Sequence, residues 1–475
     1  MYRWLDERLD LRGLYHKVLR KAFPVHHSFF LGEITLFAFV VLVLTGVFLT
    51  LNYEPSIREV RLADGRTVPA AYASVLYIDS LPFGAVIRSL HHWSAHVMIA
   101  AAFLHMLRIL LSGAYKKPRE LNYLVGLGLL GLAVVTAFTG YALPYDNYAV
   151  TATRIGYGIA HSIPWIGGAL ADLMFAGEFP GSEKSIPRLF SLHVLWLPLA
   201  LMALIGLHLA IMIKQKHTQP RYAERVAPGK ILGVPMYPQQ MVMMLILFAL
   251  YVGILTIIAG AFLAHPVEAF GPPTPQTPQV KPDWYFLWLY GLLQIIPSSW
   301  EFRLFGATIG PEFIGGVVVP GILGLVAVLL PFVDTRKDKM RYMELPSEHP
   351  VRTSAVLALL VFFLMASLAG YKIDFQQQGS ILGENAVLWT LVLGGPLLTF
   401  LVSYVLMRVF YGKAREGEAL EALPAFAPAG AAVGVLRAVP GGLAPGPARR
   451  AQPASRASSR TRAATAPTRR ARRMR

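Results

Sequence analysis

Eight apolar segments of roughly twenty residues follow one another along this chain, and they limit its fold more than any other feature. They lie at about residues 33–53, 84–113, 122–144, 190–214, 241–264, 313–333, 351–371 and 385–411. Each is long enough to cross a hydrocarbon core of about 30 Å. Hydrophobic residues make up 55% of the chain and charged residues only 15%. We therefore expect an all-α membrane protein with about eight transmembrane helices.

Basic residues gather on alternate connections between these segments. They are Arg3, Arg8, Arg12, Lys17, Arg20 and Lys21 at the start, then Lys116, Lys117 and Arg119, then Lys214, Lys216, Arg221 and Arg225, then Arg336, Lys337, Lys339 and Arg341, and finally Arg408, Lys413 and Arg415. Because cytoplasmic connections are enriched in Lys and Arg, this pattern predicts that both termini are cytoplasmic. An even number of spans agrees with that orientation.

The net charge of +17 could suggest a nucleic-acid partner, but its distribution argues against one. Ten arginines fall between Arg449 and Arg475, with no acidic residue among them. The remaining charge of about +7 is explained by orientation in the membrane. Residues 412–475 are rich in Ala, Pro and Arg and lack apolar periodicity, so we expect a disordered tail that contacts inner-leaflet lipid or solvent.

Two histidine pairs lie in the apolar segments. His91 and His105 are fourteen residues apart in the second segment, and His193 and His208 are fifteen apart in the fourth. At 100° per residue the first spacing falls about 40° short of whole turns and the second overshoots by about 60°, with rises of about 21 and 22 Å. A lone buried histidine is more often a packed residue than a ligand. Two facing pairs, however, offer the imidazoles that two six-coordinate haems require.

Glycines repeat at the same period in the flanking segments. Gly32 and Gly46 are fourteen residues apart in the first segment, and Gly126 and Gly140 are fourteen apart in the third. Glycine weakens a helix by about 1 kcal/mol relative to alanine, so repeated pairs need a reason. Close packing of membrane helices through small residues is one reason. The other reason is that the glycines leave room for two flat macrocycles, and the period that they share with the histidines favours this reason.

Three arginines lie near these histidines along the chain, namely Arg88, Arg108 and Arg188. Haem propionates are carboxylates, and a guanidinium is a strong partner for them. Snorkelling of basic residues at the ends of membrane helices is the alternative. His92 and His96 share the second segment but have no partners at the haem spacing, so we interpret them as structural.

The chain resembles cytochrome b of the cytochrome bc-type quinol oxidoreductases over about residues 20–411. The resemblance is carried by residues 87–108, 138–144, 191–209 and 281–286. It implies two non-covalent b-type haems between the second and fourth segments. In that family the first histidine of each pair, here His91 and His193, holds the outer haem. The second histidine of each pair, here His105 and His208, holds the inner one.

Residues 282–285 match the family's quinol-oxidation motif. The resemblance implies that Asp283, where the family more often has glutamate, accepts a proton from quinol and releases it outside. Pro282 and Trp284 flank it, and Tyr285 would help to form the pocket. The aspartate form tends to accompany low-potential quinones in the family, so we expect menaquinol. One electron would pass to a Rieske iron–sulfur protein and a c-type cytochrome, and the other through both haems to an inner quinone, with proton translocation.

The chain also departs from the photosynthetic branch of the family, which shares the fifteen-residue spacing. That branch attaches a further haem through a cysteine where this chain has Phe30, and this chain has no cysteine at all, so covalent haem and cluster ligation are excluded here. The inner quinone pocket is poorly specified by sequence. Lys214, Lys216 and His217 could donate protons there, although a basic inner loop is the commoner explanation.

The predicted organisation is an amphipathic segment at 1–30, a di-haem four-helix bundle at 31–220, a C-terminal four-helix region with the quinol-oxidation loop at 221–411, and the tail at 412–475. Within the outer loop at about 145–189, residues 154–175 are expected to form short surface helices. The resemblance implies a homodimeric complex in a bacterial cell membrane. Two alternatives remain: a transporter whose histidines bind metal or relay protons, and a di-haem anchor subunit of a dehydrogenase.

Overall fold

The computed structural model describes residues 2–15, 19–20, 22–24, 26–274 and 280–413. Within these ranges it contains eight helices that are long and apolar enough to span a membrane, which confirms the predicted all-α membrane fold. They are His27–Asn52, Gly84–Leu111, Glu120–Tyr141, Ser185–Gln215, Met236–Phe262, Pro311–Val333, Pro350–Ala369 and Asn385–Phe410. The predicted tail lies outside the described residues from 414 onward, as do Lys17, Lys21 and Arg415.

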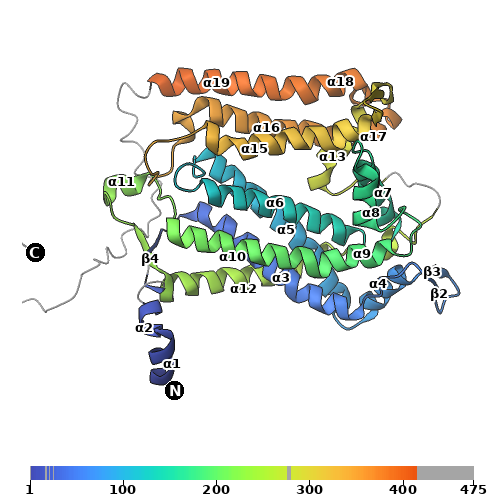
Figure 1. Cartoon of the computed structure of the whole chain (residues 1–475), viewed down its shortest axis with the longest axis horizontal. Helices are drawn as coiled ribbons and strands as arrows, with labels where there is room; N and C mark the ends of the chain where they lie inside the picture. The colour runs from blue at the N-terminus through green and yellow to red at the C-terminus, as the bar shows by residue number, and fades with distance from the viewer. Residues whose placement is uncertain (1, 16–18, 21, 25, 275–279, 414–475) are drawn as a thin grey trace, which may run out of the picture. The chain divides into compact units, whose positions relative to one another are not determined.

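Figure 1 labels the helices and strands. The spans are built from α3 (Phe30–Asn52), α5 (Gly84–Leu111), α6 (Glu120–Tyr141), α9 (Ser185–Ser191) with η3 (Leu192–Trp196) and α10 (Leu197–Gln215), η4 (Met236–Gln240) with α12 (Met241–Ile257) and η5 (Ile258–Phe262), α14 (Pro311–Phe313) with η8 (Ile314–Val318) and α15 (Val319–Val333), α16 (Pro350–Ala369), and α18 (Asn385–Trp389) with η11 (Thr390–Gly394) and α19 (Gly395–Lys413).

The remaining elements are short and lie between the spans. The helices are α1 (Tyr2–Leu9), α2 (Leu11–Leu14), η2 (His27–Phe29), α4 (Ala70–Ser80), α7 (Asn147–His161), α8 (Gly167–Phe175), α11 (Tyr222–Val226), η6 (Val267–Ala269), α13 (Trp284–Ile295), η7 (Ser298–Trp300), η9 (Pro346–Glu348), α17 (Lys372–Gln377) and η10 (Ile381–Gly383). The strands form three antiparallel pairs: β1 (Ala22–Pro24) with β4 (Gly233–Pro235), β2 (Glu59–Arg61) with β3 (Thr67–Pro69), and β5 (Phe302–Leu304) with β6 (Ala307–Ile309).

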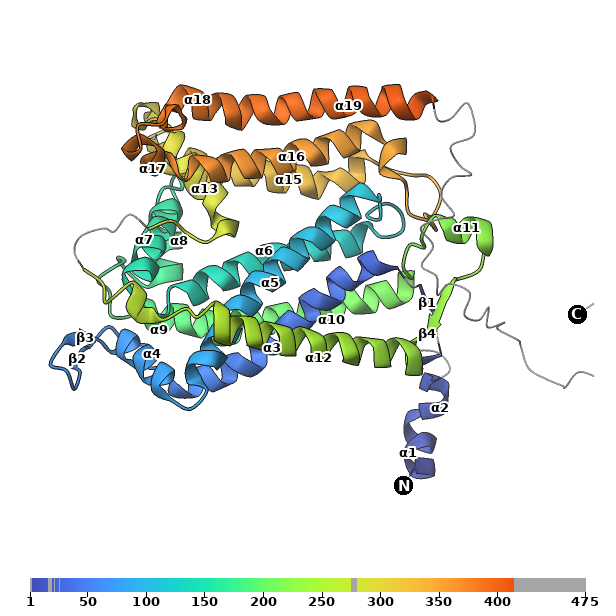
Figure 2. The same ribbon diagram turned by 180° about the vertical axis from the view of Figure 1, so that it is seen from behind.

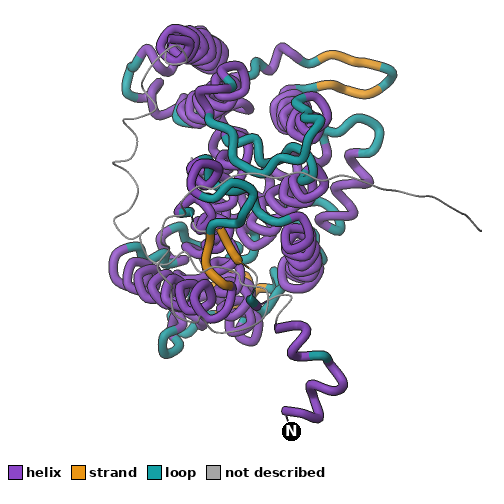
Figure 3. Tube along the Cα trace, turned by 90° about the vertical axis from the view of Figure 1, so that its left-hand side faces the viewer, coloured by secondary structure: helices purple, strands orange, loops and turns teal. Residues whose placement is uncertain are grey.

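The connections alternate between the two ends of the spanning helices (Figures 1 and 2). The loops at 112–119, 216–235 and 334–349 lie at one end, with the start of α3 and the last turn of α19; we call it the basic end. The longer connections lie at the other, the long-loop end, together with α4, α7, α8, α13 and α17. The view along the helices in Figure 3 shows that the strands are confined to these connections.

The helices pack as a first group around α3, α5, α6, α10 and α12 and a second around α13, α16 and α19. Buried Ala38, Met98 and Ala133 join α3, α5 and α6 in the first group. Many large apolar side chains, such as Leu44, Leu245 and Leu397, are exposed on the outer faces of the spans. A soluble protein rarely exposes apolar surface on this scale, whereas lipid is a suitable solvent for it.

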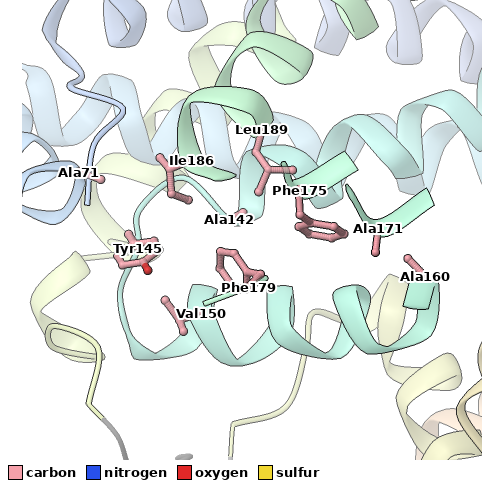
Figure 4. Close-up of a cluster of buried hydrophobic side chains, with 10 residues drawn as sticks. All are labelled: Ala71, Ala142, Tyr145, Val150, Ala160, Ala171, Phe175, Phe179, Ile186 and Leu189. Carbon is pink, nitrogen blue, oxygen red and sulfur yellow. The ribbon is translucent and has the colours of Figure 1, made fainter. Parts of the chain in front are cut away.

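A buried apolar cluster supports the loop after α6 at the long-loop end (Figure 4). Phe175, Ile186 and Leu189 are fully buried within it, and Tyr145 and Phe179 lie beside them. The expected short helices in this loop are α7 and α8, although α7 begins seven residues earlier than predicted. Asp146 caps α7 by accepting a 2.7 Å hydrogen bond from the backbone N–H of Ala149, which explains the earlier start.

A buried ionic cluster joins two connections at the basic end. Lys116 is 4% exposed, and its ammonium lies 2.9 Å from Asp334 and 3.1 Å from Glu344. Arg352 also binds the Glu344 carboxylate. Burial opposes ionisation of Glu344, but its hydrogen bonds from Arg352 and Lys116 hold its pKa below the ordinary range. The cluster therefore fastens the loop after α5 to the loop before α16.

Candidate functional site

His91 and His193 face each other near the long-loop end. His91 lies on α5 and His193 on η3, with their ring centroids 6.2 Å apart and their planes at 71°. A metal–imidazole bond is about 2 Å long, so two imidazoles that flank one metal have centroids about 6 Å apart. Among the described residues no cluster of three or more His, Cys, Asp or Glu side chains could hold a metal. The separation of the two rings is that of two imidazoles on either side of one metal.

Hydrogen bonds fix the tautomers of both rings. His193 Nδ1 lies 2.9 Å from the carbonyl of Thr136, which can only accept, so Nδ1 carries the proton. His91 Nδ1 lies 2.9 Å from Thr45 Oγ1, whose own hydrogen is donated to the Val41 carbonyl. His91 therefore donates to Thr45 as well. Both Nε2 atoms keep a lone pair, which is the form that metal-ligating histidines take.

The threonines that contact these two rings were not predicted from the sequence. Thr45 directly precedes Gly46, and Thr139, whose Oγ1 lies 3.4 Å from His193 Nδ1, directly precedes Gly140. The repeated Thr-Gly dipeptide in the first and third spans was the available signal. The Thr-Gly dipeptide distinguishes the histidine pair at the long-loop end from the pair at the basic end, because Gly32 and Gly126 follow apolar residues.

Each of the four periodic glycines lies against one of the four histidines. A Cβ atom at Gly32, Gly46 or Gly126 would lie 3.3 Å from Cε1 of His105, His91 or His208, in that order. At Gly140 it would lie 2.9 Å from both ring nitrogens of His193 and closer still to Cε1. The glycines thus give the imidazoles room to lie flat against α3 and α6. This one-to-one contact explains why the glycines and the histidines repeat at nearly the same spacing along the chain.

The fifteen-residue spacing of the second pair is accommodated by η3, which is a π-turn. The expected overshoot of about 60° assumed 100° per residue throughout and is wrong for this span. A π-turn places one extra residue in a helix without rotating the turns after it. Pro198 explains its position, because proline cannot donate to the carbonyl four residues earlier and so loosens the preceding turn.

His105 and His208 lie at the other depth, near the basic end, on α5 and α10. Arg108 lies one helical turn beyond His105, and its guanidinium stacks on Phe29 at 4.5 Å. Its Nε is buried without a hydrogen-bond partner among the described residues, and within that part of the chain its one polar contact is the Met343 sulfur at 3.4 Å. No carboxylate of the described residues lies within ion-pair distance of it. A buried guanidinium in this state suits an anionic group from outside the chain.

The other two predicted arginines have partners within the chain. Arg88 binds the Asp79 carboxylate through two hydrogen bonds of 2.6 and 2.7 Å, and together they line an open cavity of 590 Å³ beneath the β2–β3 hairpin. Arg188 is exposed and donates a 2.6 Å hydrogen bond to the Leu173 carbonyl. Contact of either residue with a haem propionate stays a prediction.

Asp283 precedes α13 at the long-loop end and accepts two hydrogen bonds. Tyr148 Oη donates to Oδ1 at 3.1 Å and Tyr285 Oη donates to Oδ2 at 3.0 Å. Burial, followed by the neighbouring carboxylate, raises the pKa of both tyrosines, so each phenol keeps its proton. Pro282 adjoins Asp283 on the other side, and Lys281 pairs with Asp374 at 2.8 Å. The motif is thus held to α7 and α17.

Of the two histidines interpreted as structural, His96 lies next to this carboxylate and His92 lies beside His96. His96 Nε2 is 3.6 Å from Asp283 Oδ2 and 3.2 Å from His92 Nε2. Trp284 Nε1 donates to His96 Nδ1 at 3.1 Å. His92 stacks on His265, with centroids 4.1 Å apart and planes at 12°. The sequence analysis missed this group, because 187 residues separate His96 from Asp283 and no periodicity links them.

At the basic end the structure separates the three residues predicted for the inner quinone. Lys214 and Lys216 are exposed. His217 is half-buried, with its ring 4.4 Å from that of Phe23 and 5.5 Å from that of Phe29. Since Arg108 stacks on Phe29 as well, only His217 of the three is placed near the His105 pair.

Comparisons with known proteins agree with this arrangement. The family profile described as Cytochrome b(N-terminal)/b6/petB matches residues 96–272, and that described as Cytochrome b(C-terminal)/b6/petD matches residues 272–391. The chain is similar to the cytochrome bc1 complex cytochrome b subunit of Streptomyces coelicolor, at 33% identity over 84% of this chain and 76% of that one. It is 35% identical to the subunit of the same name from Mycobacterium tuberculosis, over 87% of this chain and 77% of that one.

A solved structure shares the fold. A chain of a hyperthermophilic respiratory Complex III superposes with a TM-score of 0.64 over 87% of this chain and all of that one, at 24% sequence identity. The likeness extends across both groups of spanning helices, and at this identity it concerns the fold alone.

Proposed function

This chain belongs to the cytochrome b family. From that membership we propose which of its residues act in quinol oxidation and which act in transmembrane electron transfer. It is a multi-pass membrane protein, the haem-binding cytochrome b of a bc1-type complex and a catalytic subunit of a quinol–cytochrome c oxidoreductase. The observation that carries the detailed proposal is the one-to-one contact of four glycines with four histidines at two depths.

We infer that this chain binds two b-type haems within residues 31–220. His91 and His193 present Nε2 lone pairs to one, and His105 and His208 flank the other. The geometry fits such groups, since each ring lies against a glycine and no carboxylate of the described residues pairs with the Arg108 guanidinium. When bound, the haems supply one-electron carriers at two depths of the membrane.

The quinol-oxidation site of this proposal lies at Asp283, within region 221–411. A quinol hydroxyl has to lose its proton as it is oxidised, and Asp283 is a carboxylate that can accept it. Tyr148 and Tyr285 orient the carboxylate through their hydrogen bonds, while Pro282 and Trp284 set the start of α13. Menaquinol is the proposed substrate, because the aspartate form of this motif accompanies low-potential quinones.

The partners and orientation are also part of the proposal. A Rieske iron–sulfur protein and a c-type cytochrome would take one electron, because this chain has no cysteine for a cluster. The basic end would face the cytoplasm of a bacterium, with both termini on that side. His217 and Arg108 are the proposed contacts of the inner quinone, whose reduction takes up protons there. The complex would be a homodimer.

A reduced-minus-oxidised spectrum of the purified complex, with haem quantified per chain, tests this proposal. We expect two non-covalent b haems that titrate at separate potentials. Asp283→Asn should slow quinol oxidation on the order of a hundredfold with both haems retained, because it removes the proton acceptor. A complex without haem would favour the transporter alternative, and unchanged turnover of the variant would remove Asp283 from the proton path.

A further inference from the structure

The surroundings of Asp283 carry an inference that rests on the proposed function and deepens it. Asp283 faces the hydroxyls of Tyr148 and Tyr285 and the Nε2 atom of His96. Hydrogen-bond donors around a carboxylate favour its charged form. When Oδ2 takes a proton it becomes a donor and keeps only one lone pair, so one of the two donors that face it, Tyr285 Oη or His96 Nε2, has to find another acceptor.

Trp284 determines which nitrogen of His96 carries the proton. The indole N–H can only donate, and it points at His96 Nδ1 from 3.1 Å. Nδ1 is therefore an acceptor, and neutral His96 carries its single proton on Nε2. The two nearest acceptors for that N–H are His92 Nε2, which is within hydrogen-bond distance, and Asp283 Oδ2, which lies just beyond it.

His92 is the alternative acceptor for this N–H. Its Nε2 lies 3.2 Å from His96 Nε2, closer than Asp283 Oδ2 at 3.6 Å. The His92 ring is held by its stack on His265. Burial, reinforced by nearby Arg88, lowers the pKa of His265, which favours the neutral form of that ring in the stack. The Tyr285 hydroxyl is hydrogen-bonded to Asp283 alone among the described residues, whereas His96 has a second acceptor within reach.

We propose that His96 is a positioning residue that turns its Nε2–H from Asp283 to His92 when Asp283 becomes protonated, and back when the proton leaves. No proton leaves His96 and no covalent bond changes in this exchange. Trp284 keeps the tautomer that makes the exchange possible. Quinol oxidation thereby gains a carboxylate that is hydrogen-bonded in both of its protonation states.

The test compares pH–rate profiles of quinol oxidation by the haem-loaded complex carrying His96→Leu, His96→Gln or Trp284→Phe. The groups that face Asp283 and also shape its profile are His96, Tyr141, Tyr148, His265 and Tyr285. His161→Leu is the matched control, since this exposed imidazole lies on α7 and stacks on Tyr157 of the same helix.

Loss of the donor that turns toward the charged carboxylate should move the acidic limb of the profile upward by about one pH unit in His96→Leu. His96→Gln keeps a donor near the Nε2 position and should shift the limb less. Trp284→Phe lets the tautomers exchange and should shift it in the same direction. Each variant should retain two haems, and the infrared carboxyl band that disappears in Asp283→Asn should move in His96→Leu.

Profiles of His96→Leu and Trp284→Phe that match the wild type in shape would overturn the inference, provided that Asp283→Asn still slows oxidation. In that case the proposed function stands and His96 is structural. If Asp283→Asn has no effect, the assignment of the quinol-oxidation site fails first and the role of His96 fails with it. If the His96→Leu protein does not accumulate, the profile of Trp284→Phe still decides the question.

Discussion

Gly140→Ala should remove the haem held by His91 and His193 and leave the other haem in place. The new Cβ would lie 2.9 Å from both ring nitrogens of His193 and closer still to Cε1, whereas ordinary van der Waals contact begins at 3.4 Å. The imidazole would have to move by about 1 Å, whereas metal–ligand distances stay within about 0.2 Å of their usual values. Displacing a ligand's support typically lowers metal affinity on the order of 10–100-fold.

The assay is haem per chain with a redox titration of the b-type absorption. Gly128→Ala is the matched control, because it lies on α6 too and its Cβ would meet nothing within 4 Å. Gly126→Ala should have a smaller effect on the other haem, since its Cβ would lie 3.3 Å from His208. Full occupancy and an unchanged potential in Gly140→Ala would refute the idea that this glycine makes room for a haem ligand.

Three further substitutions test other parts of the molecule. His193→Leu should remove the haem at the long-loop end while the chain still inserts, leaving one b-type titration; two remaining haems would contradict the assignment. Arg108→Leu should lower the potential of the haem at His105 on the order of 60 mV, a tenfold change for one electron, because a buried cation is lost; equal potentials in variant and wild type would exclude Arg108 as its neighbour. Because the folded-state pKa of Glu344 lies below its unfolded value, its stabilisation is present above about pH 4.5 and is lost as pH falls through the folded pKa; Glu344→Gln should cost about 3–5 kcal/mol at neutral pH, as a thermal unfolding series against pH would show.

The spans and the histidine pairs were predictable because both depend on local pattern. A membrane helix is recognised by a run of apolar residues, and ligands on one helix by their spacing. The contact of Gly46 with His91, or of Gly126 with His208, follows from matching periods on neighbouring helices. Periodicity alone was therefore enough to predict both the helices and the facing histidine pairs.

The rest depends on contacts between distant segments or on irregular helix geometry. Arg88 pairs with Asp79, which lies on the preceding helix across a turn. Spacing along a single helix cannot predict a contact of this kind. The grouping of His96 with Asp283 joins α5 to the start of α13, and only the three-dimensional structure shows it. The π-turn at η3 breaks the 100° rule on which the expected orientation of His193 depended.

The π-turn also determines how this chain should be compared with any relative whose second pair of histidines is one residue closer together than His193 and His208. An extra residue inside a membrane helix would ordinarily rotate everything after it by about 100°. Here the widened turn absorbs that residue within Leu192–Trp196, so the helix on both sides keeps its register. The gap in such an alignment belongs inside this span, between His193 and Pro198, rather than in a loop. Insertion or deletion of one residue there is thus a change that this membrane helix can accept without turning His208 away from its partner.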